Sequence, residues 1–388
     1  MQQKIQTELK PSAIPHPLGV GKGRQEKNMR QQIAITGKII GLTKIKEAML
    51  QNEYDRFNQI CRQIQECRNN DIEPQYSWFK NKDIYCSTVT NAFYIIKKQF
   101  CDLSEQPLYL RNDVSRIEKK ETKFAKYWLK IPTKQRRQFW VAIKVAKEKE
   151  ELLGYKFCDS KIVKRKNGWF AHITIEKEII IKTDYKDILG IDLGIRRVAS
   201  VVQLSNGVTS FYGKELRETR GHYFHLRKNL GIKKANKTIK KIADTEKRKV
   251  NDQLHKISRN IVNQALRTDS LIVLGDLKGI SGKSNRGRKF NRKLNSMPFN
   301  KLSNFITYKA NWAGIRVIKV NEAYTSKTCH KCKELGIRNR GLFKCECGYQ
   351  DNSDRNGAIN IAERGLGEAS KSGAIVALPI TFGGTYGK

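Results

Sequence analysis

The sequence predicts an α+β protein built from several domains. Its 388 residues exceed the usual size of one domain. A helix-periodic segment near the N-terminus is followed by segments that alternate apolar and polar residues, and apolar strands alternate with helices later in the chain. No apolar run reaches the roughly 18 residues that a membrane span requires, and 39% hydrophobic residues suffice for cores. These features exclude a membrane protein and a globally disordered chain.

The charge of the chain is strongly positive. Lysine and arginine total 76 against 37 aspartates and glutamates, which gives a formal net charge of +39. Because such an excess repels itself, it indicates a polyanionic partner, and nucleic acid is the expected one. A ribosomal protein or an adapted surface is the alternative. The N-terminus has no secretory signal pattern, so we expect a protein of the reducing cytoplasm.

The N-terminal third predicts one strand and a small helical unit. Residues 1–30 contain prolines and glycines without periodicity, and we interpret them as a disordered lead. IAITGKIIGL predicts a strand, and helical spacing follows over residues 43–105. Two apolar stripes define the helices and are typical of core: Leu50, Tyr54, Phe57, Cys61 and Ile64, then Val89, Ala92, Phe93, Ile96 and Phe100.

Residues 108–182 predict a β-rich domain. QFWVAIKVAK and NGWFAHITIEKE alternate apolar and polar residues, as half-buried strands do. Basic residues among aromatic ones suit a surface that follows a phosphate backbone, although an ordinary solvated face is the alternative. The basic residues concerned are Arg136, Arg137, Lys144, Lys147, Lys161, Lys164, Arg165 and Lys166.

The apolar run 188–202 contains a single acid, Asp192, between two glycines. A carboxylate in a central strand is costly unless it is paired or binds a cation, so Asp192 indicates a metal site. The next strand turns through Asn206 and Gly207, which predicts a hairpin. Together these features predict the opening of an RNase H-like sheet.

A basic helical region over residues 214–267 and two further strands follow. The lysines and arginines of this region offer phosphate contacts or form a solvated face. SLIVLGDL then predicts a strand that ends in Gly275 and Asp276, and IRVIKVNEAY predicts another, which carries Glu322.

Four of the nine cysteines are clustered. Cys329, Cys332, Cys345 and Cys347 form C-x2-C and C-x-C pairs, and Gly348 supplies a turn residue after the second pair. Paired thiolates from two tight turns are typical of tetrahedral zinc, and four ligands leave no open position, so the motif predicts a structural zinc. The other five cysteines are interpreted as small buried hydrophobes.

SDRNGAINIAERGL predicts a helix that Ser353 caps, with Asp354 in its first turn. Acids at strand ends and at a helix start can converge. Two divalent cations held by such a cluster activate water and stabilise the leaving oxygen in phosphodiester hydrolysis.

The order GIDLG, basic helix, LIVLGDLKGI, YTSKTCHKC…CECG and DRNGAINI resembles the TnpB family, which consists of transposon-encoded RNA-guided DNA endonucleases related to type V CRISPR effectors. The resemblance implies a helical recognition lobe, a β-barrel wedge domain and an RNase H-like (RuvC) α/β nuclease domain with an inserted zinc ribbon. The implied boundaries are 31–107 for the first wedge strand and recognition lobe, 108–182 for the wedge domain, 183–328 for the nuclease domain, 329–347 for the zinc-binding target-strand element, 348–366 for the last nuclease helix and 367–388 for a flexible tail.

The resemblance also implies the catalytic residues. The first and last catalytic aspartates of the family correspond to Asp192 and Asp354. The family's middle glutamate corresponds to Gly275, which cannot ligate a metal through a side chain. Glu322, at the end of the neighbouring strand, is the candidate replacement in a Mg²⁺ site, and Asp276 is a less favoured one because its side chain should point to the opposite face.

The implied partners are a guide RNA and a double-stranded DNA target, in a monomeric ribonucleoprotein of the prokaryotic cytoplasm. Three alternatives remain: a nuclease-inactive RNA-guided repressor, which Gly275 favours, a transposase that acts without guide RNA, and a plain zinc-ribbon nucleic-acid-binding protein. The last leaves Asp192 unexplained.

Overall fold

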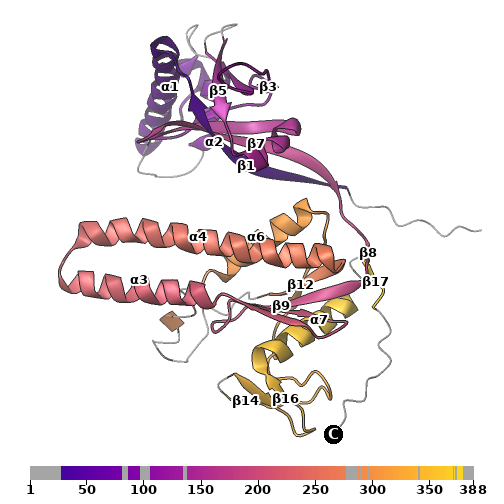
Figure 1. Cartoon of the computed structure of the whole chain (residues 1–388). Helices are drawn as coiled ribbons and strands as arrows, with labels where there is room; N and C mark the ends of the chain where they lie inside the picture. The colour runs from indigo at the N-terminus through magenta and orange to yellow at the C-terminus, as the bar shows by residue number, and fades with distance from the viewer. Residues whose placement is uncertain are drawn as a thin grey trace, which may run out of the picture. The chain divides into compact units, whose positions relative to one another are not determined.

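The computed structural model describes residues 28–80, 86–96, 105–133, 138–276, 287, 291–292, 294, 297–339, 341–369, 371 and 374–378. Residues 1–27 of the predicted lead, residues 379–388 of the predicted tail, Phe100, Arg136 and Arg137 lie outside the described residues. The last three residues of the predicted lead, 28–30, belong to a strand instead. The chain divides into two compact units, Asn28–Ile179 and the part from Ile180 onward (Figure 1). The units are described separately.

The N-terminal unit combines a seven-stranded sheet with two helices. Helices α1 (Lys44–Asn69) and α2 (Cys86–Ile95) are joined through the short 3-10 helix η1 (Tyr76–Phe79). The sheet has the order β2-β6-β7-β1-β5-β4-β3. Its strands are β1 (Asn28–Ile40), β2 (Leu108–Leu110), β3 (Ile117–Lys119), β4 (Tyr127–Pro132), β5 (Gln138–Lys144), β6 (Lys156–Arg165) and β7 (Gly168–Ile180), with 3-10 turns η2 (Lys147–Lys149) and η3 (Glu151–Gly154).

Helix α1 forms where the helical spacing predicted it. The side chain of Thr43 caps its first turn by accepting a hydrogen bond from the Lys46 amide, a common way to satisfy an unpaired helix donor. The predicted stripe is buried, and Tyr54 meets Trp169 of β7 edge to face at 5.3 Å. The predicted β-barrel is not confirmed, because the sheet order ends at β2 and β3 and no pairing joins these two strands within the described residues.

The C-terminal unit is built on a five-stranded sheet of order β11-β10-β9-β12-β13. β10 pairs antiparallel with β9 and β11, and β12 and β13 run parallel to β9. The hairpin predicted at Asn206 and Gly207 is confirmed, with Gly207 at a φ of +67°. The strands are β9 (Asp187–Asp192), β10 (Ala199–Gln203), β11 (Thr209–Tyr212), β12 (Ser270–Asp276) and β13 (Val317–Asn321), and β8 (Asp184–Tyr185) pairs separately with β17 (Ile375–Val376).

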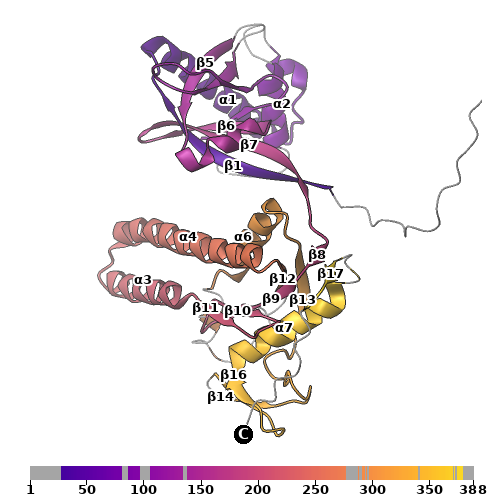
Figure 2. The same ribbon diagram turned by 45° about the vertical axis from the view of Figure 1, so that its right-hand side comes forward.

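Helices cover both faces of this sheet (Figures 1 and 2). The basic region consists of two antiparallel helices, α3 (Lys214–Ile232) and α4 (Asn236–Arg267), and α6 (Phe299–Trp312) packs beside α4. Helix α7 (Ser353–Ala369) lies on the opposite face. It lies very close to β9, because a Cβ on Gly190 would be 2.3 Å from the Ala358 carbonyl oxygen.

A small three-stranded sheet precedes α7. It consists of β14 (Ile337–Asn339), β15 (Leu342–Lys344) and β16 (Gln350–Asn352), and Phe343 is fully buried in it.

None of the described helices combines the length and apolar character needed to cross a bilayer.

Candidate active site

The carboxyl ends of three parallel strands meet at one edge of the five-stranded sheet. In the parallel pairing of β9 with β12, Ile191 lies opposite Leu274. The next residues, Asp192 and Gly275, therefore lie side by side. In β13, Val320 pairs with Gly275. Glu322 comes two residues later and therefore points to the same face of the sheet as Gly275. The parallel strands thus bring Asp192 and Glu322 to one edge, as the sequence predicted.

The side chain of Glu322 occupies the space beside Gly275. A Cβ on Gly275 would lie 2.8 Å from Glu322 Oε2 and 3.1 Å from the Ile361 side chain. A side chain at position 275 would require this carboxylate to move, and glycine leaves it in place. Glu322 Oε2 is buried and has no hydrogen-bond partner among the described residues.

Helix α7 supplies the third carboxylate. Asp354 lies in its first turn and is buried, with its amide donating to the Asn352 side chain at 2.8 Å. Asp192 faces the same turn, since a Cβ on Gly357 would be 3.1 Å from Asp192 Oδ2. Arg338 of β14 donates to Asp354 Oδ1 at 2.8 Å and so links the small sheet to the site.

The proximity of these acids shifts their pKa values. Burial and the neighbouring Asp354 raise the pKa of Asp192 to about 7, with Arg338 acting in the opposite direction. Burial and the charges of Asp192 and Asp276 raise the pKa of Glu322 to about 7. Clustered carboxylates that resist ionisation in this way gain most from a bound cation, which offsets their repulsion.

Asp276 lies farther along β12, opposite Asn321 of β13. Strand alternation directs its side chain away from the face that Gly275 presents. Its charge still reaches Glu322, as the raised pKa of Glu322 shows.

The residues present fit Mg²⁺ by chemistry, since Mg²⁺ prefers carboxylate oxygens, and the unpartnered Glu322 Oε2 provides a buried acceptor. The three carboxylates are less tightly gathered than the cysteines. Within the described part of the chain, the four cysteines are the one group of potential ligands whose atoms converge closely enough for a single ion.

Two buried asparagines of α7 hold the segment that follows Glu322. Asn360 Nδ2 donates to the carbonyl oxygens of Thr325 and Thr328 at 2.8 and 2.7 Å, and Asn356 Nδ2 donates to Thr328 at 2.7 Å. The Thr325 amide in turn donates to the Glu322 carbonyl at 3.2 Å. These asparagines and Arg338 were not among the site residues predicted from the sequence. The four-residue spacing of the two asparagines in DRNGAINI was the available signal.

The four cysteines converge as predicted. Their sulfur atoms all lie within 4.8 Å of one another, with Cys329 and Cys347 at 3.8 Å and Cys332 and Cys345 at 3.3 Å. Thiolates bound to zinc at about 2.3 Å in a tetrahedron are about 3.8 Å apart. Gly348, at a φ of +84°, makes the predicted turn. The cluster is therefore suited to a structural zinc ion.

Comparison with solved structures defines the class of the fold. The chain superposes on a Cas12f1 protein, solved in a Cas12f1–sgRNA–target DNA complex, with a TM-score of 0.57 over 83% of each chain at 16% sequence identity. The fold is thus that of a Cas12-type effector, an α+β protein of several domains.

Sequence comparisons find TnpB-like and Cas12f relatives. Residues 299–361 match the model of the Cas12f1-like TNB domain. The chain is 32% identical over 181 residues to a TnpB-like protein of Methanocaldococcus jannaschii, covering 44% of this chain and 65% of that protein. It is 31% identical over 231 residues to the CRISPR-associated endodeoxyribonuclease Cas12f1 of Sulfoacidibacillus thermotolerans, covering 54% and 53%. The matches thus span less than two thirds of these relatives. The resemblance to the TnpB family is confirmed.

Proposed function

We propose that this protein is an RNA-guided DNA endonuclease of the TnpB type, whose catalytic acids are Asp192, Glu322 and Asp354. The observation that carries the proposal is that Glu322 stands beside Gly275, the position at which the family pattern has its glutamate. The carboxylate of Glu322 occupies the space that a side chain at position 275 would take. The order β11-β10-β9-β12-β13 is the one expected of an RNase H-like sheet, which supports a RuvC-like domain.

In this proposal the three carboxylates hold divalent cations, which supply an activated water and stabilise the leaving oxygen of the phosphodiester. Asp192 and Glu322 offer ligand oxygens from the strand ends, and Asp354 offers its own from the first turn of α7. Arg338 donates to Asp354 Oδ1 at 2.8 Å and so orients this carboxylate, whose other oxygen, Oδ2, would be offered to a cation. Asn356 and Asn360 hold Glu322 in position through the loop that follows it.

The partners follow from the relatives and the charge. The solved relative was bound to a guide RNA and a target DNA, and the net charge of +39 suits many phosphates. In the proposed mechanism base pairing with a guide RNA selects the target, and the protein reads a short flanking motif in double-stranded DNA. We further propose a monomeric ribonucleoprotein with one structural zinc ion at the four cysteines.

The first experiment measures cleavage of guide-matched DNA flanked by randomised sequence. The protein is purified with its RNA and assayed in Mg²⁺ and in EDTA, as wild type and as Glu322→Gln. We expect Mg²⁺-dependent cleavage by the wild type and its loss in the variant. Wild-type-like cleavage by Glu322→Gln would refute the catalytic role of Glu322.

A positional exchange gives a sharper test. Glu322→Ala and Gly275→Glu should each abolish cleavage, the first by removing the carboxylate and the second by forcing two side chains into one space. The combined variant returns a glutamate to the strand position that faces Asp192, and it should recover part of the activity. A folded double variant that is as inactive as both single variants would contradict the exchange.

One observation favours a second function. Gly275 removes the side chain that the family places beside Asp192, as expected of a nuclease-inactive RNA-guided repressor. This function predicts that the wild type binds guide-matched DNA tightly and leaves it uncut in Mg²⁺, which the first experiment detects directly.

A further inference from the structure

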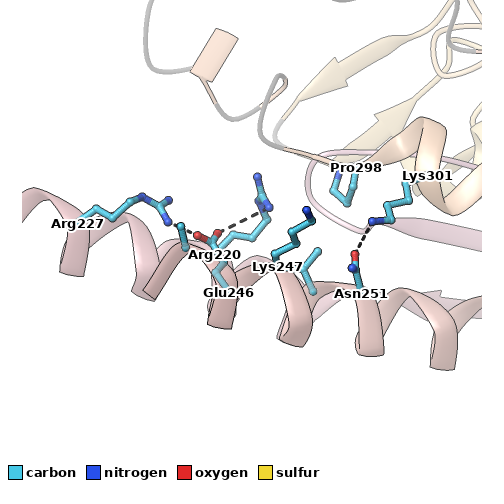
Figure 3. Close-up of a pocket in the computed structure, with 9 residues that line it drawn as sticks. Arg220, Arg227, Glu246, Lys247, Asn251, Pro298 and Lys301 are labelled. Atoms are coloured by element: carbon cyan, nitrogen blue, oxygen red, sulfur yellow. Dashed lines mark hydrogen bonds and ion pairs between the residues drawn. The ribbon is translucent and has the colours of Figure 1, made fainter. Parts of the chain in front are cut away.

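A buried carboxylate joins the two basic helices of the C-terminal unit. Glu246 of α4 is 6% exposed. Arg227 of α3 donates to its Oε2, and Arg220 of α3 lies 3.7 Å from its Oε1 (Figure 3). The Nε atom of Arg220 is buried and has no hydrogen-bond partner among the described residues. Two guanidinium groups are therefore fixed by one carboxylate, and one positive charge is left uncompensated.

A cavity of about 400 Å³ lies beside this triad. We call it the Glu246 pocket, and Figure 3 shows the charged ends of Arg220, Lys247 and Lys301 on the side where Pro298 lies. Four cations and a single carboxylate are found among its described lining residues, and Lys301 donates to the neutral Asn251 at 2.6 Å. The lining residues are Arg220, Arg227, Ala243, Glu246, Lys247, Val250, Asn251, Pro298 and Lys301.

A second cavity of about 420 Å³ shares Arg220, Arg227 and Glu246 with the Glu246 pocket. It adds an aromatic platform, because the guanidinium of Arg292 lies 3.9 Å from the ring centroid of Phe224. Guanidinium and aromatic planes are the surfaces on which nucleobases stack. A basic cavity of about 400 Å³, much larger than one phosphate group, next to such a platform suits a nucleotide strand better than a free inorganic anion.

We propose that the Glu246 pocket binds a backbone phosphate of a nucleic-acid strand, an inference that rests on the proposed nucleic-acid binding. Glu246 acts as a positioning residue that aims Arg220 and Arg227 while Lys247 and Lys301 approach the phosphate from α4 and α6. Forked guanidinium donors match phosphate oxygens, and the excess of three positive charges in the lining requires an anion.

Glu246 separates this arrangement from a merely basic surface. Replacing it by Gln makes the pocket more positive, so a surface that attracts phosphates by net charge would bind nucleic acid more tightly. If Glu246 instead orients the two arginines, the same substitution weakens binding because their donors lose a fixed direction. The two explanations therefore predict opposite signs.

The experiment measures the affinity of the full-length protein, freed of co-purified nucleic acid, for fluorescent 12-nucleotide single strands of DNA and of RNA, by anisotropy over a range of KCl concentrations. The variants are Lys247→Gln, Lys301→Gln and Glu246→Gln. The charge-matched control is Lys256→Gln, since Lys256 is an exposed lysine of α4 outside the pocket that pairs with Asp252 at 2.8 Å. Circular dichroism melting confirms that each variant is folded.

We expect each pocket lysine variant to weaken binding roughly three- to tenfold and to lower the salt slope by about 0.7, the loss of one phosphate contact on a single strand. Glu246→Gln should also weaken binding, and Lys256→Gln should change it less than twofold. Equal losses for DNA and RNA indicate a contact to the shared backbone, and a loss confined to one of them identifies that strand as the ligand.

Two results overturn the proposal. One is a Lys247→Gln or Lys301→Gln variant that behaves like Lys256→Gln, and the other is tighter binding by a folded Glu246→Gln. Either leaves the proposed endonuclease function intact if the wild type binds the strands. A wild type that binds neither DNA nor RNA would instead refute the nucleic-acid function itself. If Glu246→Gln does not fold, the Lys247→Gln and Lys301→Gln variants test the proposal by themselves.

Discussion

The carboxylate site and the cysteine cluster differ in how the chain assembles them. The four cysteines lie within 19 consecutive positions, on two tight turns, and their sulfur atoms converge within 4.8 Å. The three carboxylates come from β9, from the residue after β13 and from α7. They do not converge on one point as the sulfur atoms do, and Asp354 is instead hydrogen-bonded to Arg338. One site is complete and local, whereas the other is open and depends on the tertiary fold.

This difference has a chemical counterpart. Four thiolates would fill the coordination sphere of zinc and leave no position for water, so the cluster is suited to a structural role. Among the carboxylates, Glu322 has an oxygen without a hydrogen-bond partner among the described residues, and the pKa values of Asp192 and Glu322 are raised. These carboxylates can therefore still bind a cation. Arg338 connects the two regions and couples the ribbon to Asp354.

The largest expected effect separates catalysis from structure. Asp192→Asn removes a charged ligand without changing size, and we expect cleavage to fall by roughly a thousandfold, about 4 kcal/mol of transition-state stabilisation. Zinc content and melting temperature should stay near those of the wild type. Single-turnover cleavage rates and elemental analysis measure both properties. A variant that cleaves at more than a tenth of the wild-type rate would contradict a metal-ligand role for Asp192.

Cys345→Ser tests the other region. Structural zinc sites supply folding free energy directly, so we expect zinc to fall from about one ion per chain to near zero and the ribbon to become protease-sensitive. Cleavage should fall as well, because Arg338 and β16 lose their support beside Asp354. Cys86 of α2, which the sequence analysis interpreted as buried, is exposed. Cys86→Ser is therefore the matched control and should retain its zinc. Full zinc content in Cys345→Ser would remove this residue from the cluster.

The pH dependence of stability should distinguish the carboxylates in metal-free protein. Burial raises the pKa of Asp192 to about 7, so in EDTA the folded state binds a proton that the unfolded state loses near pH 4. The free energy of unfolding should therefore decrease as pH rises from about 4 to about 7, by on the order of 4 kcal/mol. Urea unfolding at several pH values measures the decrease. Asp192→Asn should reduce this decrease without abolishing it, because Glu322, whose pKa is also raised to about 7, contributes in the same direction. An unchanged profile in that variant would assign the dependence to other groups.

The smallest effect concerns the glycine beside Glu322. Gly275→Ala places a Cβ 2.8 Å from Glu322 Oε2 and 3.1 Å from Ile361 Cδ1, and we expect a loss of about 1 kcal/mol in stability because the end of the Glu322 side chain and Ile361 must shift. Gly367→Ala in α7 meets no atom within 4 Å and should stabilise by up to about 1 kcal/mol. Thermal melts compare the two. Equal melting temperatures for both variants would show that the space at position 275 is not filled.

Hydrophobic periodicity predicted much of the secondary structure. The helix over residues 44–69, the hairpin at Asn206–Gly207 and the strand ending at Asp276 follow from local patterns that the backbone obeys. The predicted barrel is not confirmed, because closure depends on pairing between strands far apart in the chain, and no local pattern specifies it. The predicted domain boundaries remain predictions for the same reason.

The sequence by itself determined the net charge, the cysteine cluster and the identity of the candidate acids, because these depend on composition or on spacing within a few residues. Only the tertiary structure decided that Glu322 occupies the space beside Gly275, that Arg338 reaches Asp354, and that Glu246 holds Arg220 and Arg227. Strand register and helix packing set these contacts, and both arise from burying apolar faces of segments that are distant along the chain.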